Sequence, residues 1–123
     1  DYEIYLDGVQ VKNADGQFGS GAKANLAISA FNIGRRNTGD RYFDGLIDEV
    51  AIWTSPLSAS DVVAIYNSGT PADLTDYSPV GWWRMGEDAT WDGTNWTIPD
   101  ASTNSNAGTT QNMAEASRVT DTP

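Results

Sequence analysis

The stretch Phe43-Asp44-Gly45-Leu46-Ile47-Asp48-Glu49-Val50-Ala51-Ile52-Trp53 decides the fold of this 123-residue chain. In a β-strand, successive side chains point to opposite faces. Leu46, Asp48 and Val50 would therefore share one face, and Glu49 would lie on the other. We expect a long strand over residues 42–53 that carries one carboxylate on each otherwise apolar face.

A carboxylate buried without a partner costs several kcal/mol or becomes protonated. Each of the two acids in this strand should therefore be compensated. The sequence offers Arg35, Arg36 and Arg41 as cationic partners, and a bound Ca²⁺ is an alternative. A hydrogen-bonded or salt-bridged structural acid is the competing interpretation.

The segments on either side also read mainly as strands. Asp7-Gly8 favours a tight hairpin turn, and Ser58 with Asp61 has the spacing of a helix capping box. We expect a hairpin over 2–12, a strand over 26–34, a polar turn over 35–40, a short helix from Ser58 to Gly69, a linker over 70–79, a strand over 80–85, and short strands near 96–98 and 108–110. This pattern predicts an all-β sandwich with one short helix.

The composition excludes several function classes. The formal net charge is −10, with no Cys and no His. Such a surface repels phosphate backbones, so we expect no nucleic-acid binding. Ser-His-Asp catalysis and Cys or His metal sites are impossible, whereas the oxygen ligands preferred by Ca²⁺ are abundant. No apolar run approaches the ~20 residues of a membrane helix, so we expect no membrane insertion.

Seven motifs are spaced along the chain: Tyr5-Leu6-Asp7-Gly8-Val9, Asn32-Ile33-Gly34-Arg35, Tyr42–Trp53, Leu57–Asp61, Ile65–Gly69, Val80–Gly86 and Asp100–Gly108. Together they resemble the laminin-G-like, concanavalin A-like jelly roll of the lectin/glucanase class. The first 70 residues are similar to the C-terminal half of such a domain, and residues 80–108 to its opening strand and loop. Thr103 and Ser105 stand where that loop usually has glycines.

The resemblance implies an unusual order of halves. Residues 1–75 would be the C-terminal half of one sandwich, and residues 76–123 the opening segment of a following repeat. The alternative is one circularly permuted sandwich over residues 1–123. The first arrangement is favoured because the central strands of an ordinary domain have no counterpart here, which would leave a sheet poorly covered.

The resemblance also implies a structural Ca²⁺ that links the opening loop to the long strand. Transferred to this sequence, its ligands are Asp100 and Asp48. Asn104 lies in the same Asp- and Asn-rich loop, where several oxygens can turn toward one point. An ordinary Asx-rich turn is the alternative interpretation.

The five tryptophans are a large number for this length. Trp82 and Trp83 are neighbours in one expected strand, so one should point inward and the other outward or into a second layer. Aromatic rings beside polar side chains suit sugars, because a pyranose has an apolar face and a rim of hydroxyls. The candidate ligand-binding residues are Trp91, Trp96, Asp92 and Asn95. Tryptophans that pin a long loop are the alternative.

These observations favour a non-catalytic recognition or adhesion module, stabilised by calcium, that binds a glycan or a protein. It would belong to a larger multidomain chain or assembly located outside the cell, at the cell surface or in a virion. A structural repeat of a virion fibre, tail or surface array is the alternative. A glycoside hydrolase or lyase is disfavoured, because Asp48 and Glu49 would point to opposite strand faces.

Overall fold

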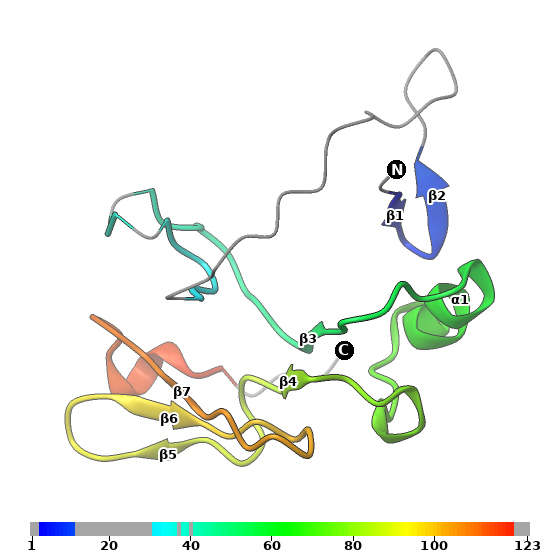
Figure 1. Cartoon of the computed structure of the whole chain (residues 1–123). Coiled ribbons are helices and arrows are strands. Elements are labelled where there is room, and N and C mark those ends of the chain that lie inside the picture. Colours follow the sequence, from blue (N-terminus) through cyan, green and yellow to red (C-terminus); the bar gives the residue numbers. More distant parts are fainter. Residues whose placement is uncertain (1–2, 12–30, 37, 40, 120–123) are drawn as a thin grey trace.

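The computed structural model describes residues 3–11, 31–36, 38–39 and 41–119 (Figure 1). Within these residues, seven short strands form three small antiparallel sheets, accompanied by one α-helix. The strands are β1 (Ile4–Leu6), β2 (Val9–Val11), β3 (Val50–Ile52), β4 (Gly81–Trp83), β5 (Thr90–Trp91), β6 (Trp96–Ile98) and β7 (Gly108–Thr109). The helix is α1 (Ala59–Tyr66), and three 3₁₀ turns are η1 (Asn67–Gly69), η2 (Thr75–Tyr77) and η3 (Glu115–Ser117).

The predicted N-terminal hairpin is confirmed. β1 and β2 pair with Ile4 opposite Val11 and Leu6 opposite Val9. The turn residues Asp7 and Gly8 have φ angles of 50° and 73°, as a type I′ turn requires. Of the strand predicted over 26–34, residues 26–30 lie outside the described residues, and no strand is present over 31–34.

The prediction of a long strand over 42–53 is wrong except at its C-terminal end. Only Val50–Ile52 is a strand, and Tyr42 makes an isolated antiparallel bridge with Arg35. Glu49 has a φ of 48°, a left-handed conformation that interrupts an extended chain. The alternation of faces therefore stops at Glu49, and the side chains before it do not follow the strand pattern.

The predicted helix and its start are confirmed. The Ser58 hydroxyl accepts a bond from the Asp61 N–H, and the Asp61 carboxylate accepts from the Ser58 N–H, which completes a capping box. The helix ends at Asn67, which has a φ of 46°. The expected end at Gly69 is therefore late, because Asn67 already adopts the left-handed conformation that terminates a helix.

The described core is small and rich in tryptophan. Trp82, Trp83 and Trp96 are 6%, 9% and 8% exposed, and Leu74 is 4% exposed. Both tryptophans of β4 are thus buried, so this strand has structure on both faces. Leu74 comes from the segment 70–79 that the sequence suggested as a linker, and the Trp53 indole donates to the Tyr77 carbonyl in the same segment. This stretch is therefore packed into the structure.

The sheet β3–β4 joins the two halves of the sequence. Val50 lies opposite Trp83, and Ile52 opposite Gly81. One strand precedes residue 75 and the other follows it, so the two predicted segments share a sheet. The mainly antiparallel strands with one short helix agree with the expected all-β class.

The Gly8 turn supplies a stability prediction. A Cβ on Gly8 would lie 2.7 Å from Tyr66 Cδ1, whereas a Cβ on Gly39 would meet nothing within 4 Å, and both residues have positive φ angles. Gly39→Ala should cost about 1–2 kcal/mol for the backbone conformation alone. Gly8→Ala should cost more, because the Tyr66 ring must also move. Urea unfolding followed by circular dichroism measures both, and equal losses would show that the contact of the turn with α1 contributes nothing.

Candidate functional site

The Asp100 carboxylate is the best-enclosed polar group of the described residues. It is 9% exposed and accepts three backbone N–H bonds, each 2.8–2.9 Å long. The donors are Trp82 and Ser102 to Oδ1, and Asn106 to Oδ2. The Ala101 N–H in turn donates to the Trp82 carbonyl at 2.7 Å. Residues 100 and 101 therefore satisfy both backbone groups of Trp82.

The same contacts set the protonation state of Asp100. Burial acts to raise the pKa of Asp100, but the backbone N–H bonds from Trp82, Ser102 and Asn106 outweigh it and leave the pKa lowered. The group is therefore ionised in the folded protein, as its three donors require. This gives the Asp100 charge a structural role.

A second polar centre surrounds the indole of Trp82. The indole N–H donates to Glu49 Oε2 at 2.6 Å, and Arg84 Nε donates to Glu49 Oε1 at 3.1 Å. The Arg84 guanidinium also lies 5.6 Å from the centre of the Trp82 ring and pairs with Glu87 at 3.3 Å. The hydrogen bond to Glu49 raises the pKa of Arg84. Glu49 is thus compensated by an arginine that the sequence reasoning did not consider.

The predicted calcium ligands lie in two different sets of contacts. Asn104 accompanies Asp100 in one loop, where the Asn104 amide donates to the Val80 carbonyl at 2.9 Å. Asp48 is exposed and lies with Glu49 and Glu87, with one oxygen of each acid within 4.8 Å of the others. The expectation of a buried Asp48 among apolar neighbours is therefore wrong, because the strand alternation fails at Glu49.

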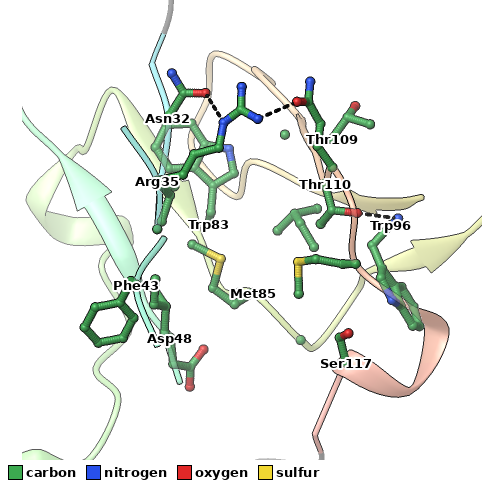
Figure 2. Close-up of a pocket in the computed structure, with 18 of the residues that line it drawn as sticks. Asn32, Arg35, Phe43, Asp48, Trp83, Met85, Trp96, Thr109, Thr110 and Ser117 are labelled. Atoms are coloured by element: carbon green, nitrogen blue, oxygen red, sulfur yellow. Dashed lines mark hydrogen bonds between the residues drawn. The ribbon is translucent and has the colours of Figure 1, made fainter. Parts of the chain in front are cut away.

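The described residues enclose a cleft of about 1030 Å³, shown in Figure 2. Its walls come from both halves of the sequence and are mainly apolar. One wall is formed by residues 31–35, 42–43 and 45–48, and the other by β4, β6, β7 and the residues near η3. Its large apolar side chains are Phe31, Ile33, Tyr42, Phe43, Leu46, Ile47, Ile52, Trp83, Met85, Trp96, Ile98, Met113 and Val119.

Polar groups connect the two walls of this cleft. Arg35 donates to Asn32 Oδ1 at 3.3 Å and, across the cleft, to Gln111 Oε1 at 2.7 Å (Figure 2). The Phe31 ring also stacks on Trp83, with 5.7 Å between ring centres. Contacts between segments that are distant in the sequence therefore join the two walls of the cleft.

The predicted ligand-binding residues Trp91, Trp96, Asp92 and Asn95 are brought together by the hairpin β5–β6. Trp91 and Trp96 lie opposite each other, with ring centres 5.4 Å apart. Asp92 Oδ1 accepts from the Thr94 and Asn95 N–H groups in the turn. The Trp96 indole is buried and donates to the Ala114 carbonyl at 3.2 Å. Trp96 thus fastens the C-terminal segment, which agrees with the alternative interpretation of the loop tryptophans.

Sequence reasoning missed Arg84 and the cleft. The position of Arg84, two residues after Trp82 in the same strand region, was a usable signal, because i and i+2 share a strand face. The cleft had no comparable signal, since its walls come from segments up to 88 residues apart, such as Phe31 and Val119.

Comparison with known families agrees with these features. A laminin G domain model, described as the concanavalin A-like lectin/glucanases superfamily, matches residues 1–63, just over half of the chain. The chain belongs to this superfamily. The predicted family and the concanavalin A-like sandwich fold are thereby confirmed. Neither the comparison with curated proteins nor that with solved structures found a match. No helix of the described residues is long and apolar enough to cross a membrane.

Asp100→Asn tests the structural role of the carboxylate. An amide offers one oxygen in place of two, so the N–H of either Trp82 or Asn106 loses its acceptor. At neutral pH we expect a loss of about 2–3 kcal/mol in the free energy of unfolding. Asp92→Asn is the matched control, because a single amide oxygen can accept both bonds of that exposed turn; its melting temperature should shift much less.

The pH dependence provides a second readout of the same variant. Because folding lowers the pKa of Asp100, its ionisation contributes stability above the ordinary carboxyl pKa of 3.8, and this contribution is lost as the pH falls through the folded-state value. The stability gap between wild type and Asp100→Asn should therefore be constant from neutral pH to about pH 5 and narrow in stronger acid. A gap that does not change with pH would contradict this assignment.

Proposed function

We propose that this superfamily member is a non-catalytic recognition module whose cleft binds an extended apolar segment of a protein. The observation that supports this function is the apolar lining of the cleft, to which both halves of the sequence contribute. Exposed apolar surface of this kind marks interaction sites. The superfamily suggests a carbohydrate- or protein-binding module, and the chemistry of the cleft favours the protein.

A sugar would need hydrogen-bonding groups that are free to serve its hydroxyls. In the described cleft, several such groups already serve the protein. Arg35 donates to Asn32 and Gln111, and the Thr110 hydroxyl accepts the backbone N–H of Trp96 at 2.8 Å. The indole N–H of Trp83 donates to the Asn106 carbonyl. An apolar strand needs fewer polar partners, because alternate side chains can fill the cleft.

The carboxylates of the cleft support a non-catalytic role. Only Asp48 and Glu87 among its described lining residues are acidic. They belong to one cluster with oxygens within 4.8 Å, and Glu87 is paired with Arg84. A glycoside hydrolase places its two carboxyl groups on either side of a substrate, about 5–10 Å apart. We also propose that this chain is part of a larger secreted or surface protein, or of a repetitive assembly, as the sequence predicts.

Binding can be tested with two panels of immobilised probes. The first holds extended peptides that alternate apolar and polar residues, and the second holds neutral and acidic glycans. We expect saturable peptide binding that Leu46→Ser weakens about tenfold, which corresponds to ~1.4 kcal/mol. Val63→Ser is the control, since Val63 is 55% exposed on α1 and Leu46 is 75% exposed in the cleft. Saturable glycan binding without peptide binding would overturn the proposal.

We also propose a structural Ca²⁺, on the strength of the family resemblance. Of its suggested ligands, Asp100 already accepts three N–H bonds, which leaves one of about four acceptor positions. Asn104, in the same loop as Asp100, would supply a further oxygen, and Asp48 would have to approach from its cluster with Glu49 and Glu87. Binding of an ion would therefore join the Asp100 loop to the Asp48 cluster, and the thermal stability of the protein is the measurement that detects it.

Calcium at a hundredfold excess over its dissociation constant should stabilise the folded chain by about 2.7 kcal/mol and raise the melting temperature by several degrees. Tryptophan fluorescence follows the melt, and excess chelator should reverse the shift. Asp48→Asn should abolish the effect, whereas the exposed neighbour Asp44→Asn should preserve it. A melting temperature that is unchanged by calcium would exclude the proposed site.

A further inference from the structure

We propose that the apolar segment bound in the cleft is the β1–β2 hairpin of a second copy of this chain. This inference rests on the proposed function and names its partner. It begins with the distribution of exposed apolar side chains. Of the twelve large hydrophobic side chains that are exposed in the described residues, four belong to the hairpin and six line the cleft; the other two, Val63 and Tyr66, lie on α1.

The hairpin presents one continuous aliphatic face. Ile4 lies opposite Val11 and Leu6 opposite Val9, so the four side chains share one side of the ribbon. Their exposed fractions are 56%, 43%, 65% and 68%, in that order. A two-stranded hairpin is marginally stable by itself, and an apolar face gives it a reason to pack against another surface. The hairpin is therefore suited to pack into an apolar cleft.

The cleft is the complementary surface. The large apolar side chains of the cleft that are exposed are Phe31, Tyr42, Phe43, Leu46, Met113 and Val119. Leu46 is the most exposed of these, at 75%. In the same chain, the turn of the hairpin lies against Tyr66 of α1. No described hairpin residue lines the cleft of its own chain, and Figure 1 shows the hairpin beside α1, apart from β5–β7.

The charges of the hairpin and of the cleft also bear on which partner can bind. Two chains of net charge −10 repel each other, so a contact between copies must be locally complementary. The described hairpin residues carry two acids, Glu3 and Asp7, and no base. The cleft is lined by Arg35 and Arg118, besides Asp48 and Glu87. The Arg118 guanidinium lies 5.7 Å from the centre of the Trp96 ring and has no carboxylate partner among the described residues, so it can receive an acid of the hairpin.

A reciprocal exchange follows from these surfaces. In a twofold pair, each hairpin occupies the cleft of the other copy, so the same contact is made twice and the assembly closes. This arrangement covers the aliphatic face of the hairpin and the apolar walls of the cleft together.

The full chain can be tested by sedimentation velocity over a range of concentrations. We expect a species of twice the 13.2-kDa chain mass. Leu6→Asp in the hairpin and Leu46→Asp in the cleft should each raise the dimer dissociation constant at least tenfold. Val63→Asp, at an exposed apolar position of α1, should leave it unchanged. Because the substituted positions are 55–75% exposed, their circular dichroism spectra should match the wild type.

Mixing the two disrupted variants gives the decisive readout. A Leu6→Asp copy keeps an intact cleft, and a Leu46→Asp copy keeps an intact hairpin, so the mixture can form one of the two contacts. We expect partial recovery of dimer in the mixture and none in either variant alone. A chain that stays monomeric at all concentrations would overturn this inference. The peptide panel separates that failure from failure of the proposed function, because a monomer that still binds peptides through Leu46 retains the function with another partner.

Discussion

The rest of the described structure depends on how the backbone of Trp82 is satisfied on both sides. Strand β3 lies along one edge of β4, with Ala51 opposite Trp82. On the other side, the Asp100 carboxylate accepts the Trp82 N–H, and the Ala101 N–H donates to the Trp82 carbonyl. A carboxylate thus takes the place that a neighbouring strand would fill. Because buried backbone groups must be paired, this arrangement lets β4 pass through the core without a second full-length partner.

The indole groups extend this principle through the molecule. Trp53, Trp83 and Trp96 donate to carbonyls of segments 18–24 residues away in the sequence, and Trp82 donates to Glu49. A buried indole N–H needs an acceptor, so each ring contributes both apolar area and a directional tie. With few buried aliphatic side chains among the described residues, these ties position irregular segments such as 70–79 and 112–117. Residues Asn112, Met113 and Ser117 of the second segment line the cleft.

Local signals predicted the local elements, and the family motifs predicted the fold class, but neither predicted the contacts between distant segments. The Asp7-Gly8 turn and the Ser58 capping box depend on residues at most three positions apart, so the sequence specifies them directly. The strand over 42–53 failed because alternation says nothing of the left-handed φ at Glu49. The partner of Glu49 is Arg84, 35 residues away, and such pairing depends on the register of β3 and β4. The same limit applies to the cleft, whose walls meet only in the folded chain.

The acidic composition and the apolar cleft have opposite effects on association between copies of the chain. A net charge of −10 keeps copies of the chain apart, whereas exposed apolar side chains draw surfaces together. Binding is selective when repulsion acts over the whole surface and attraction is confined to one complementary contact. Two arginines place local positive charge at the cleft. Arg35 joins its walls, and Arg118 lies over Trp96 within it. An acidic, apolar strand would satisfy both the walls and these charges, and the β1–β2 hairpin has that chemistry.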